Sequence, residues 1–361
     1  MEFFRYSTVF LGMIESEAGA IVGPISVFFG AIINFIFNIV AAITPVGTLG
    51  ISIILMTFVV RTAMLPMQFK MQKNQIKMQE LKPEIDKIKE KYKDARDPEL
   101  KRKMNVEIQQ LYSTNGVNML ASCLPMLVLM PIFFALMYIM RHSHMFISGV
   151  GDVYSELSNT LIYDTFESTG ELVSALGNLV QSYLPAGMPL DIGVAGDLNR
   201  AIAVFSDETW AQLFAFLNET GRSAEVYNIQ NMLAAKNSIE TFLGINLVAN
   251  SGLAWPGIVI PILSAGTMII STLGMMRKKD AEQMPGQKAM MYAMPLMMGF
   301  FTITVAAGVG VYWIASNVYQ VGQQHFIGKY YKSERYAQKE AERAELKKEK
   351  KNLREKSSAR K

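Results

Sequence analysis

The chain has 361 residues, of which 50% are hydrophobic and 18% charged, and its formal net charge is +4. The apolar residues gather in four runs without Asp, Glu, Lys or Arg: Ala18–Val60, Ile108–Met140, Thr241–Met276 and Ala289–Gly328. A helix needs about 20 apolar residues to cross a bilayer, so each run is long enough for one span. The composition therefore argues against a soluble globular domain, and the single cysteine, Cys123, excludes an intramolecular disulfide.

Residues 1–46 form the first expected region, an N-terminal segment with an interfacial helix. The apolar stretch 19–43 follows Glu15 and Glu17 and has no lysine nearby. A sixth span here would put those acids on the cytoplasmic side with no basic residue beside them, so we favour a helix lying on the outer leaflet. No cleavage site, transit peptide or lipobox cysteine is evident, which favours a bacterial plasma membrane.

The distribution of charge predicts which segments face the cytoplasm. Lys and Arg outnumber acids by 12 to 8 in residues 65–116, by 4 to 2 in 277–288 and by 13 to 6 in 326–361. Residues 141–240 hold 4 basic residues against 12 acids. By the positive-inside rule the first three segments are cytoplasmic, including the C-terminus, and 141–240 faces outward.

This orientation predicts an all-α, polytopic membrane protein with five core transmembrane helices. The expected spans are Gly47–Gln68, Val117–Met140, Trp255–Met276, Ala289–Thr304 and Gly308–His325. The last two share one apolar run, and we expect a tight turn between them at Ala306–Gly310, where two glycines relax the backbone.

Five regions follow from this topology. The N-terminal segment precedes residues 47–140, which hold spans one and two with a cytoplasmic helical hairpin at 69–116 between them. Residues 141–240 form an extracytoplasmic, acidic, helical insertion, residues 241–325 hold spans three to five, and residues 326–361 form a basic cytoplasmic tail.

The hairpin has recognisable helix boundaries. Pro83 marks a break or a new helix start after Leu81-Lys82, and Asp97 is placed to cap a second helix that begins at Pro98. The charged faces of the hairpin and the tail are either solvated or in contact with lipid headgroups or ribosomal RNA.

Arg61 is the candidate functional residue, because it is a charge inside an expected span. It precedes Lys70, the expected cytoplasmic boundary, by nine residues, about 13 Å of helix. The other expected spans contain no Asp or Glu to neutralise it. A charge at such depth is costly, so we predict a water-filled cavity open to the cytoplasm. Thr57 lies one turn before Arg61 on the same face.

Span five adds polar side chains that can line the same cavity. They are Ser316, Asn317, Gln320, Gln323 and Gln324, with Trp313 above them. The alternative is that these groups bond between helices. Nothing indicates an enzyme, a cofactor or a metal, since no catalytic motif is present and the pair His142 and His144 lacks a third ligand.

A hydrated groove with one positive charge predicts a membrane protein insertase or chaperone. It would shelter polar parts of nascent membrane proteins while their apolar stretches move into lipid. The alternatives are a transporter or channel that uses Arg61 to bind a small anion, and a scaffold whose outer region recruits partners. A transporter would favour internal repeats, and none is evident.

The sequence also resembles the YidC/Oxa/Alb insertase family. The resemblance rests on Thr57–Arg61, Leu65-Pro66, Glu80–Glu84, Gly116–Met126, Met130–Leu136, Ala293–Pro295 and Val311–Asn317. It implies a five-span core with a groove closed toward the outside, acting alone or beside the Sec translocon, often with ribosome contact. It also implies that Arg61 is the groove charge and that Thr57 and Trp313 contact substrate. The long segment 141–240 departs from the short outer loop usual in the family.

Overall fold

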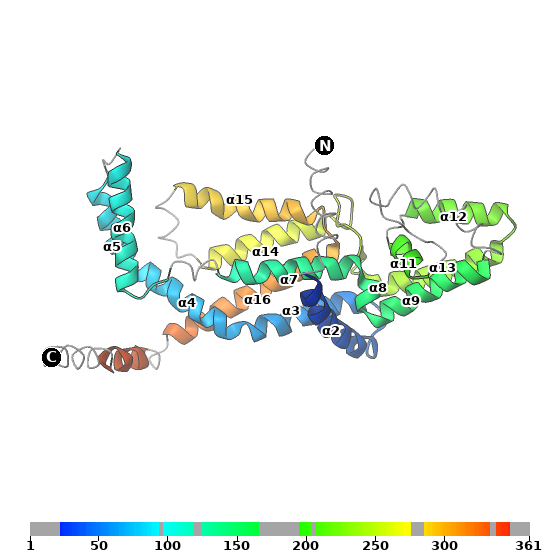
Figure 1. Ribbon diagram of the computed structural model, residues 1–361, viewed down its shortest axis with the longest axis horizontal. Coiled ribbons are helices and arrows are strands. Elements are labelled where there is room, and N and C mark those ends of the chain that lie inside the picture. Colours follow the sequence, from blue (N-terminus) through cyan, green and yellow to red (C-terminus); the bar gives the residue numbers. More distant parts are fainter. Residues whose placement is uncertain are drawn as a thin grey trace. The chain divides into compact units, whose positions relative to one another are not determined.

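The computed structural model describes residues 22–93, 97–118, 124–165, 195–203, 205, 207–275, 285–332 and 337–346. Helices account for almost all regular structure in these parts, which confirms the all-α prediction (Figure 1). The chain divides into two compact units. The first comprises residues 1–60, 128–269 and 281–317, and the second comprises residues 61–127, 270–280 and 318–361.

Apolar helices form the body of the first unit. They are α2 (Val22–Ala41), α3 (Thr48–Ala63), α7 (Leu124–Arg141), α14 (Val259–Met275), α15 (Pro285–Thr302) and α16 (Ala307–Lys332). The last five coincide broadly with the expected spans, and α3, α7, α14 and α16 each continue into the second unit. Among the described residues, α2 is long and apolar enough to span a bilayer by itself, and α3 with the start of the next helix passes the same test as a bent pair.

The turn between the last two apolar helices differs from the expectation. It occupies residues 303–306, so Gly308 and Gly310 lie inside the first turns of α16 instead of forming the turn. The reason is packing: a Cβ on Gly310 would lie 2.1 Å from Ile260 Cγ2, and one on Gly308 would lie 2.8 Å from Met140 Sδ. These glycines allow α14 and α7 to approach α16 closely.

The loop before α14 fixes the start of α16. Ala307 N donates to Ala249 O and Gly308 N donates to Leu247 O, both at 2.8 Å, and Ser251 N donates to Val305 O at 3.2 Å. The first two bonds satisfy N–H groups that a helix N-terminus leaves without an intrahelical acceptor, and the third ties the loop to the residue before the turn's end.

The N-terminal helix α2 packs against α8 (Ser143–Phe146) and α9 (Ser148–Asn159). The carboxamide oxygen of Asn34 accepts from Ser148 N at 2.9 Å and from Ser148 Oγ at 3.0 Å. Two close contacts flank these bonds, because Gly30 lies against the Phe146 ring and Gly149 against the Phe37 ring. The opposite face of α2 is apolar and exposed, with Val27, Phe28 and Phe35 all more than 60% accessible.

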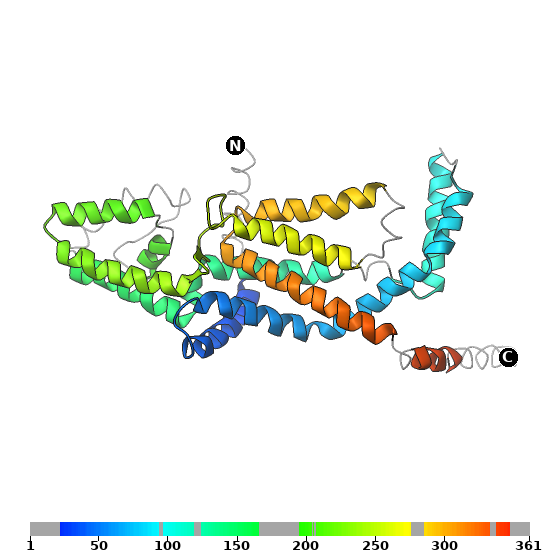
Figure 2. The ribbon, with the colours of Figure 1, turned by 180° about the vertical axis from the view of Figure 1, so that it is seen from behind.

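The described part of residues 141–240 is mainly helical. It contains α8, α9, the π-helix η2 (Thr160–Thr165), α11 (Ala195–Ala203), α12 (Asp207–Glu219) and α13 (Ser223–Glu240), followed by the short strands β1 (Thr241–Phe242) and β2 (Ile245–Asn246). Figure 2 shows α12 and α13 joined by a short turn. Leu157, Leu198, Leu213 and Ile229 form a buried apolar interior. Residues 166–194 of this segment lie outside the described residues.

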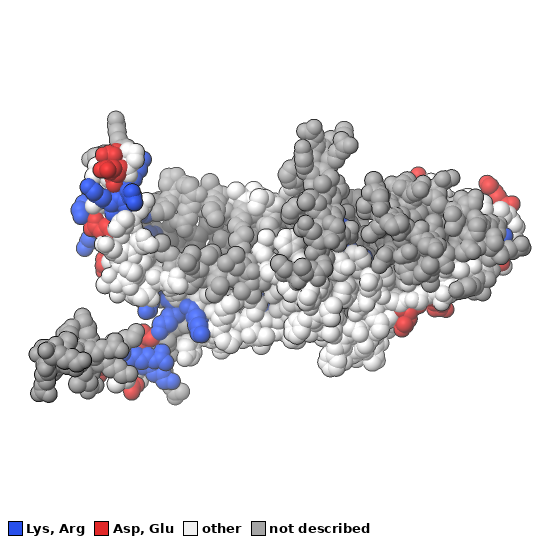
Figure 3. All heavy atoms as spheres, viewed as in Figure 1, with Lys and Arg blue, Asp and Glu red and all other residues white. Residues whose placement is uncertain are grey.

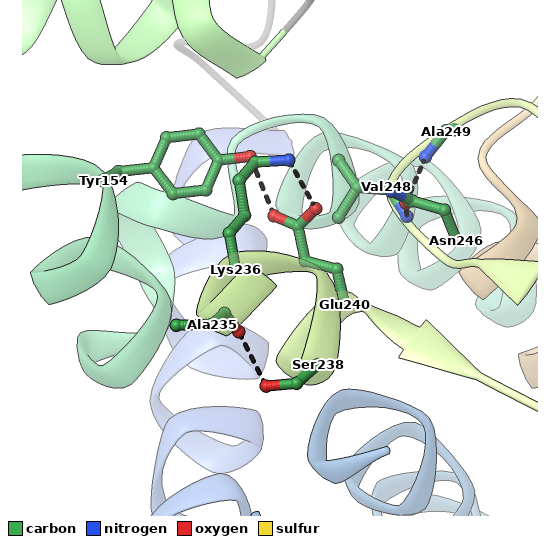
Figure 4. Close-up of polar contacts among 8 residues, drawn as sticks. All are labelled: Tyr154, Ala235, Lys236, Ser238, Glu240, Asn246, Val248 and Ala249. Atoms are coloured by element: carbon green, nitrogen blue, oxygen red, sulfur yellow. Dashed lines mark hydrogen bonds and ion pairs between the residues drawn. The ribbon is translucent and has the colours of Figure 1, made fainter. Parts of the chain in front are cut away.

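A buried polar network joins α9 to the end of α13 (Figure 4). The carboxylate of Glu240, 1% exposed, accepts from Tyr154 Oη at 2.8 Å and from Lys236 Nζ at 2.9 Å. The ammonium of Lys236 also lies 5.3 Å from the centre of the Tyr154 ring. Burial, and then the adjacent Glu240 carboxylate, raise the pKa of the Tyr154 hydroxyl well above its ordinary value.

The second unit begins with α4 (Leu65–Glu80), α5 (Lys82–Lys91) and α6 (Pro98–Thr114). Asp97 caps α6, because its Oδ1 accepts from Glu99 N at 2.9 Å, and Pro98 is the first helical residue as predicted. Leu81, Ile85 and Val117 form a small buried core with apolar residues of α4 and α6. Lys91 Nζ donates to Glu107 Oε2 at 3.1 Å across the α5–α6 pair, and Figure 3 shows charged side chains over these helices.

In the same unit, the end of α16 packs along α4. Thr62 Oγ1 and Tyr319 Oη form a hydrogen bond at 2.9 Å, and the Phe69 ring contacts the rings of Phe326 and Tyr330 at 6.5 and 5.5 Å. Helix α16 therefore continues seven residues beyond His325, the expected end of span five.

Candidate functional site

The six predicted groove residues lie in both units. Thr57, Trp313, Ser316 and Asn317 belong to the first unit, and Arg61 and Gln320 belong to the second. Each set is described within its own unit.

Helix α3 buries three hydroxyl groups, those of Thr48, Ser52 and Thr57, which are at most 1% exposed. Thr48 and Ser52 lie one turn apart on one side of the helix, whereas Thr57 shares another side with Arg61. Each hydroxyl donates to the carbonyl four residues earlier, with oxygen–oxygen distances of 2.9, 2.7 and 2.6 Å respectively. This local bond satisfies the hydroxyl proton, while the oxygen lone pairs keep capacity to accept further bonds.

Arg61 lies in the last turn of α3 and is 7% exposed. It is the basic residue of a 16-residue helix that otherwise consists of apolar residues, glycine, serine and threonine. One turn separates it from Thr57, as the helical period predicts. The structure thus contains a buried guanidinium at the end of an apolar helix.

Trp313 belongs to an aromatic cluster that joins α7, α15 and α16. Its indole stacks on the Phe133 ring, with centroids 5.0 Å apart and an interplanar angle of 8°. Phe301 completes the cluster, 6.0 Å from Phe133 and 6.2 Å from Trp313. Trp313 is half-buried, so one part of the ring holds the helices together and another part remains accessible.

The polar residues of α16 in the first unit face α14. Asn317 Nδ2 donates to Thr267 Oγ1 at 3.2 Å, and Thr267 Oγ1 donates to Leu263 O at 2.6 Å. Ser316 and Ser264, 1% and 3% exposed, are buried in the same unit. Asn317 therefore bonds between helices, which was the alternative interpretation of this residue.

The second unit continues this polar contact between α14 and α16. Gln324 Nε2 donates to Ser271 O at 3.3 Å, and Gln320 is half-buried one turn earlier. Thr48, Ser52, Ser264, Thr267 and Ser271 were not among the predicted site residues. Their spacing gave a signal, because Thr44, Thr48 and Ser52 recur every four residues before Thr57. No group of three His, Cys, Asp or Glu residues able to hold a metal occurs within the described parts.

The comparison with known proteins agrees with this arrangement of apolar helices. The family model described as 60Kd inner membrane protein matches residues 41–176 and 209–335, more than half of the chain. The chain belongs to this family. The match confirms the resemblance seen in the sequence and includes the helices that carry Thr57, Arg61 and Trp313.

Several curated relatives are named as insertases. The chain is 41% identical over 107 residues to membrane protein insertase YidC 1 of Bacillus anthracis, which covers 29% of this chain and 41% of that protein. It is 26% identical over 278 residues to YidC 2 of the same organism, covering 77% and 71%. It is 39% identical over 130 residues to MisCB of Bacillus subtilis, covering 32% and 47%. The chain thus matches less than half of the length of the first of these relatives.

Proposed function

We propose that this protein is a membrane protein insertase of the bacterial plasma membrane. It would move segments of nascent membrane proteins from the cytoplasm into the bilayer without covalent chemistry. The observation that carries the proposal is the buried guanidinium of Arg61, one turn from the buried hydroxyl of Thr57 on an otherwise apolar helix. The names of the relatives, membrane protein insertases, support it.

The topology proposed for this activity has five core spans. They correspond to α3, α7, α14, α15 and α16, with the hairpin α5–α6 and the tail in the cytoplasm and the α8–α13 region outside. The charge distribution supports this orientation, because Lys and Arg gather on the cytoplasmic segments and acids on the outer one.

The mechanism follows from the cost of polar groups in hydrocarbon. Moving an unpaired amide of a client from water into lipid costs roughly 2–7 kcal/mol, and moving an ionised carboxylate costs far more. A hydrated groove lined by Thr57, Trp313, Ser316, Asn317 and Gln320 would replace part of that hydration. The positive charge of Arg61 would attract acidic residues of the client, whose apolar stretch could then move sideways into lipid.

Partners outside the bilayer belong to the same proposal. The basic tail and the charged hairpin would contact the ribosome that delivers the client, and the protein would act alone or beside the Sec translocon. The Lys and Arg residues in residues 65–116 and 326–361 support an electrostatic contact with RNA phosphates.

The test is insertion of a single-span client with an acidic outer tail into liposomes that contain only this protein. Wild type, Arg61→Lys and Arg61→Ala are compared by protease protection, with Lys70→Ala as a control that removes an exposed charge nine residues further on. We expect Arg61→Lys and Lys70→Ala to insert the client and Arg61→Ala to fail.

The other outcomes separate the alternatives. Equal insertion by all variants would reduce Arg61 to one contributor to groove hydration. Failure of the wild type would indicate an obligatory Sec partner. Flux of a small anion through the wild-type protein, in the absence of client, would favour a transporter.

A further inference from the structure

The cytoplasmic tail has two parts of opposite charge. The tail helix, residues 337–346, holds three acids and two basic residues, whereas residues 347–361 hold two acids and eight basic residues. Helix α4 carries Lys70, Lys73 and Lys77 and a single acid, Glu80. The tail helix therefore complements the charge of α4, and the last fifteen residues do not.

The structure places these complementary charges in contact. The carboxylate of Glu340 accepts a hydrogen bond from Lys73 Nζ and forms an ion pair with it. The hydrogen bond from Lys73, and then the charges of Lys73, Lys77 and Arg343, lower the pKa of the Glu340 carboxyl. The group is thus fully ionised at neutral pH.

The contact continues a longer packing between the same two parts of the chain. Thr62 bonds to Tyr319, Phe69 packs on Phe326 and Tyr330, and Lys73 then meets Glu340. The successive partners advance in the same direction along both segments. The Lys73–Glu340 pair therefore follows the order of the preceding contacts along both segments.

We propose that the Lys73–Glu340 pair is an electrostatic latch, which holds the tail helix on α4 until ribosomal RNA binds the basic end of the tail. The inference rests on the proposed function, because the RNA belongs to the ribosome that delivers the client. The side chains of Lys73 and Glu340 are 30% and 36% exposed, and ion pairs of such accessibility are weak and sensitive to salt. A polyanion bound to the Lys and Arg residues of 347–361 gains by releasing counterions, and its phosphates then compete with the Glu340 carboxylate for Lys73 and Lys77.

Distance measurements on the full chain test the latch. Cys123→Ser removes the single cysteine, after which Gln75→Cys and Ala341→Cys carry spin labels on α4 and the tail helix. The protein, reconstituted in neutral liposomes, is measured as wild type, Glu340→Lys, Lys73→Glu and the charge-swapped double variant. Glu345→Lys, an equal charge change at an exposed position of the same helix, is the matched control.

We expect either single variant to lower the population of short distances roughly twofold to fivefold, because one exposed ion pair is lost. The charge-swapped variant should recover it and the Glu345→Lys control should keep it. Added ribosomes should open the wild-type latch, and this opening should weaken with rising salt.

Three results would overturn the latch: unchanged distances in both single variants, no recovery in the charge-swapped variant, or no opening by ribosomes. Equal opening by vesicles containing anionic lipid, without ribosomes, would overturn the assignment to RNA. Client insertion is measured on the same preparations. Loss of insertion with the expected distances would refute the proposed function alone, and normal insertion with unchanged distances would refute the latch alone.

Discussion

Two regions of this protein bury polar groups, and they satisfy them differently. In the α8–α13 region, which is the proposed outer region, Glu240 receives hydrogen bonds from Tyr154 and Lys236, so the charges neutralise each other within one closed network. On α3, the hydroxyls of Ser52 and Thr57 bond to carbonyls of their own helix. The first arrangement fixes one helix against another, whereas the second leaves hydroxyl oxygens whose remaining lone pairs can still accept hydrogen bonds.

The difference indicates distinct roles. A closed network of buried charges contributes chiefly to a defined structure, because any change leaves a charge without compensation. Hydroxyl groups with spare acceptor capacity suit a partner that moves past the helix, because they can bond to its successive donor groups. Stability should therefore depend most on the network, and insertion should depend most on α3.

The largest expected effect is the loss of one partner from the closed network. Lys236→Met should destabilise the outer region by about 3–5 kcal/mol, because it leaves the Glu240 carboxylate buried and uncompensated. Thermal unfolding in detergent, together with limited proteolysis of the outer region, measures the loss. The double variant Lys236→Met/Glu240→Gln should recover most of it, and Lys93→Met, at an exposed pair with Glu90, is the control. A single variant as stable as wild type would show that the network is not a structural lock.

A second, smaller effect tests the close packing around α16. Gly310→Ala should cost about 1–3 kcal/mol, because the added Cβ would lie 2.1 Å from Ile260 Cγ2 and must displace it. Gly322→Ala is a matched control in the same helix, since a Cβ there meets no atom within 4 Å. It should be neutral or slightly stabilising, because alanine favours a helix more than glycine does. Equal melting temperatures for the two variants would contradict the packing role of Gly310.

The sequence predicted helix boundaries well where the signals are local. Asp97, Pro98 and the break before Pro83 act on their immediate neighbours, and the structure places helix ends at these residues. The turn before α16 was misplaced because glycine marks turns and close helix contacts alike. Only the neighbouring Ile260 and Met140, far away in the sequence, distinguish the two roles of Gly308 and Gly310.

The candidate site was predictable in part for the same reason. A charge in an apolar helix identifies Arg61 without any tertiary information, and the helical period then selects Thr57. Thr48 and Ser52 escaped selection because single hydroxyls are common in apolar helices. The stacking of Trp313 on Phe133 and the bond from Asn317 to Thr267 join separate helices, so no local pattern reveals them.

The smallest expected effect tests the buried hydroxyl groups of α3. Thr57→Val keeps the shape of the side chain and removes the hydroxyl, so its protein should stay folded while client insertion falls roughly 2- to 12-fold, the equivalent of one hydrogen bond. Thr302→Val is the matched control, because Thr302 is also fully buried and bonds to its own helix, at 2.6 Å from Gly299 O, on α15. Initial insertion rates into liposomes, at equal protein content, measure both variants. An equal fall in the insertion rate of both variants would assign the effect to general packing of buried threonines. A fall for Thr57→Val alone would assign it to the hydroxyl of Thr57.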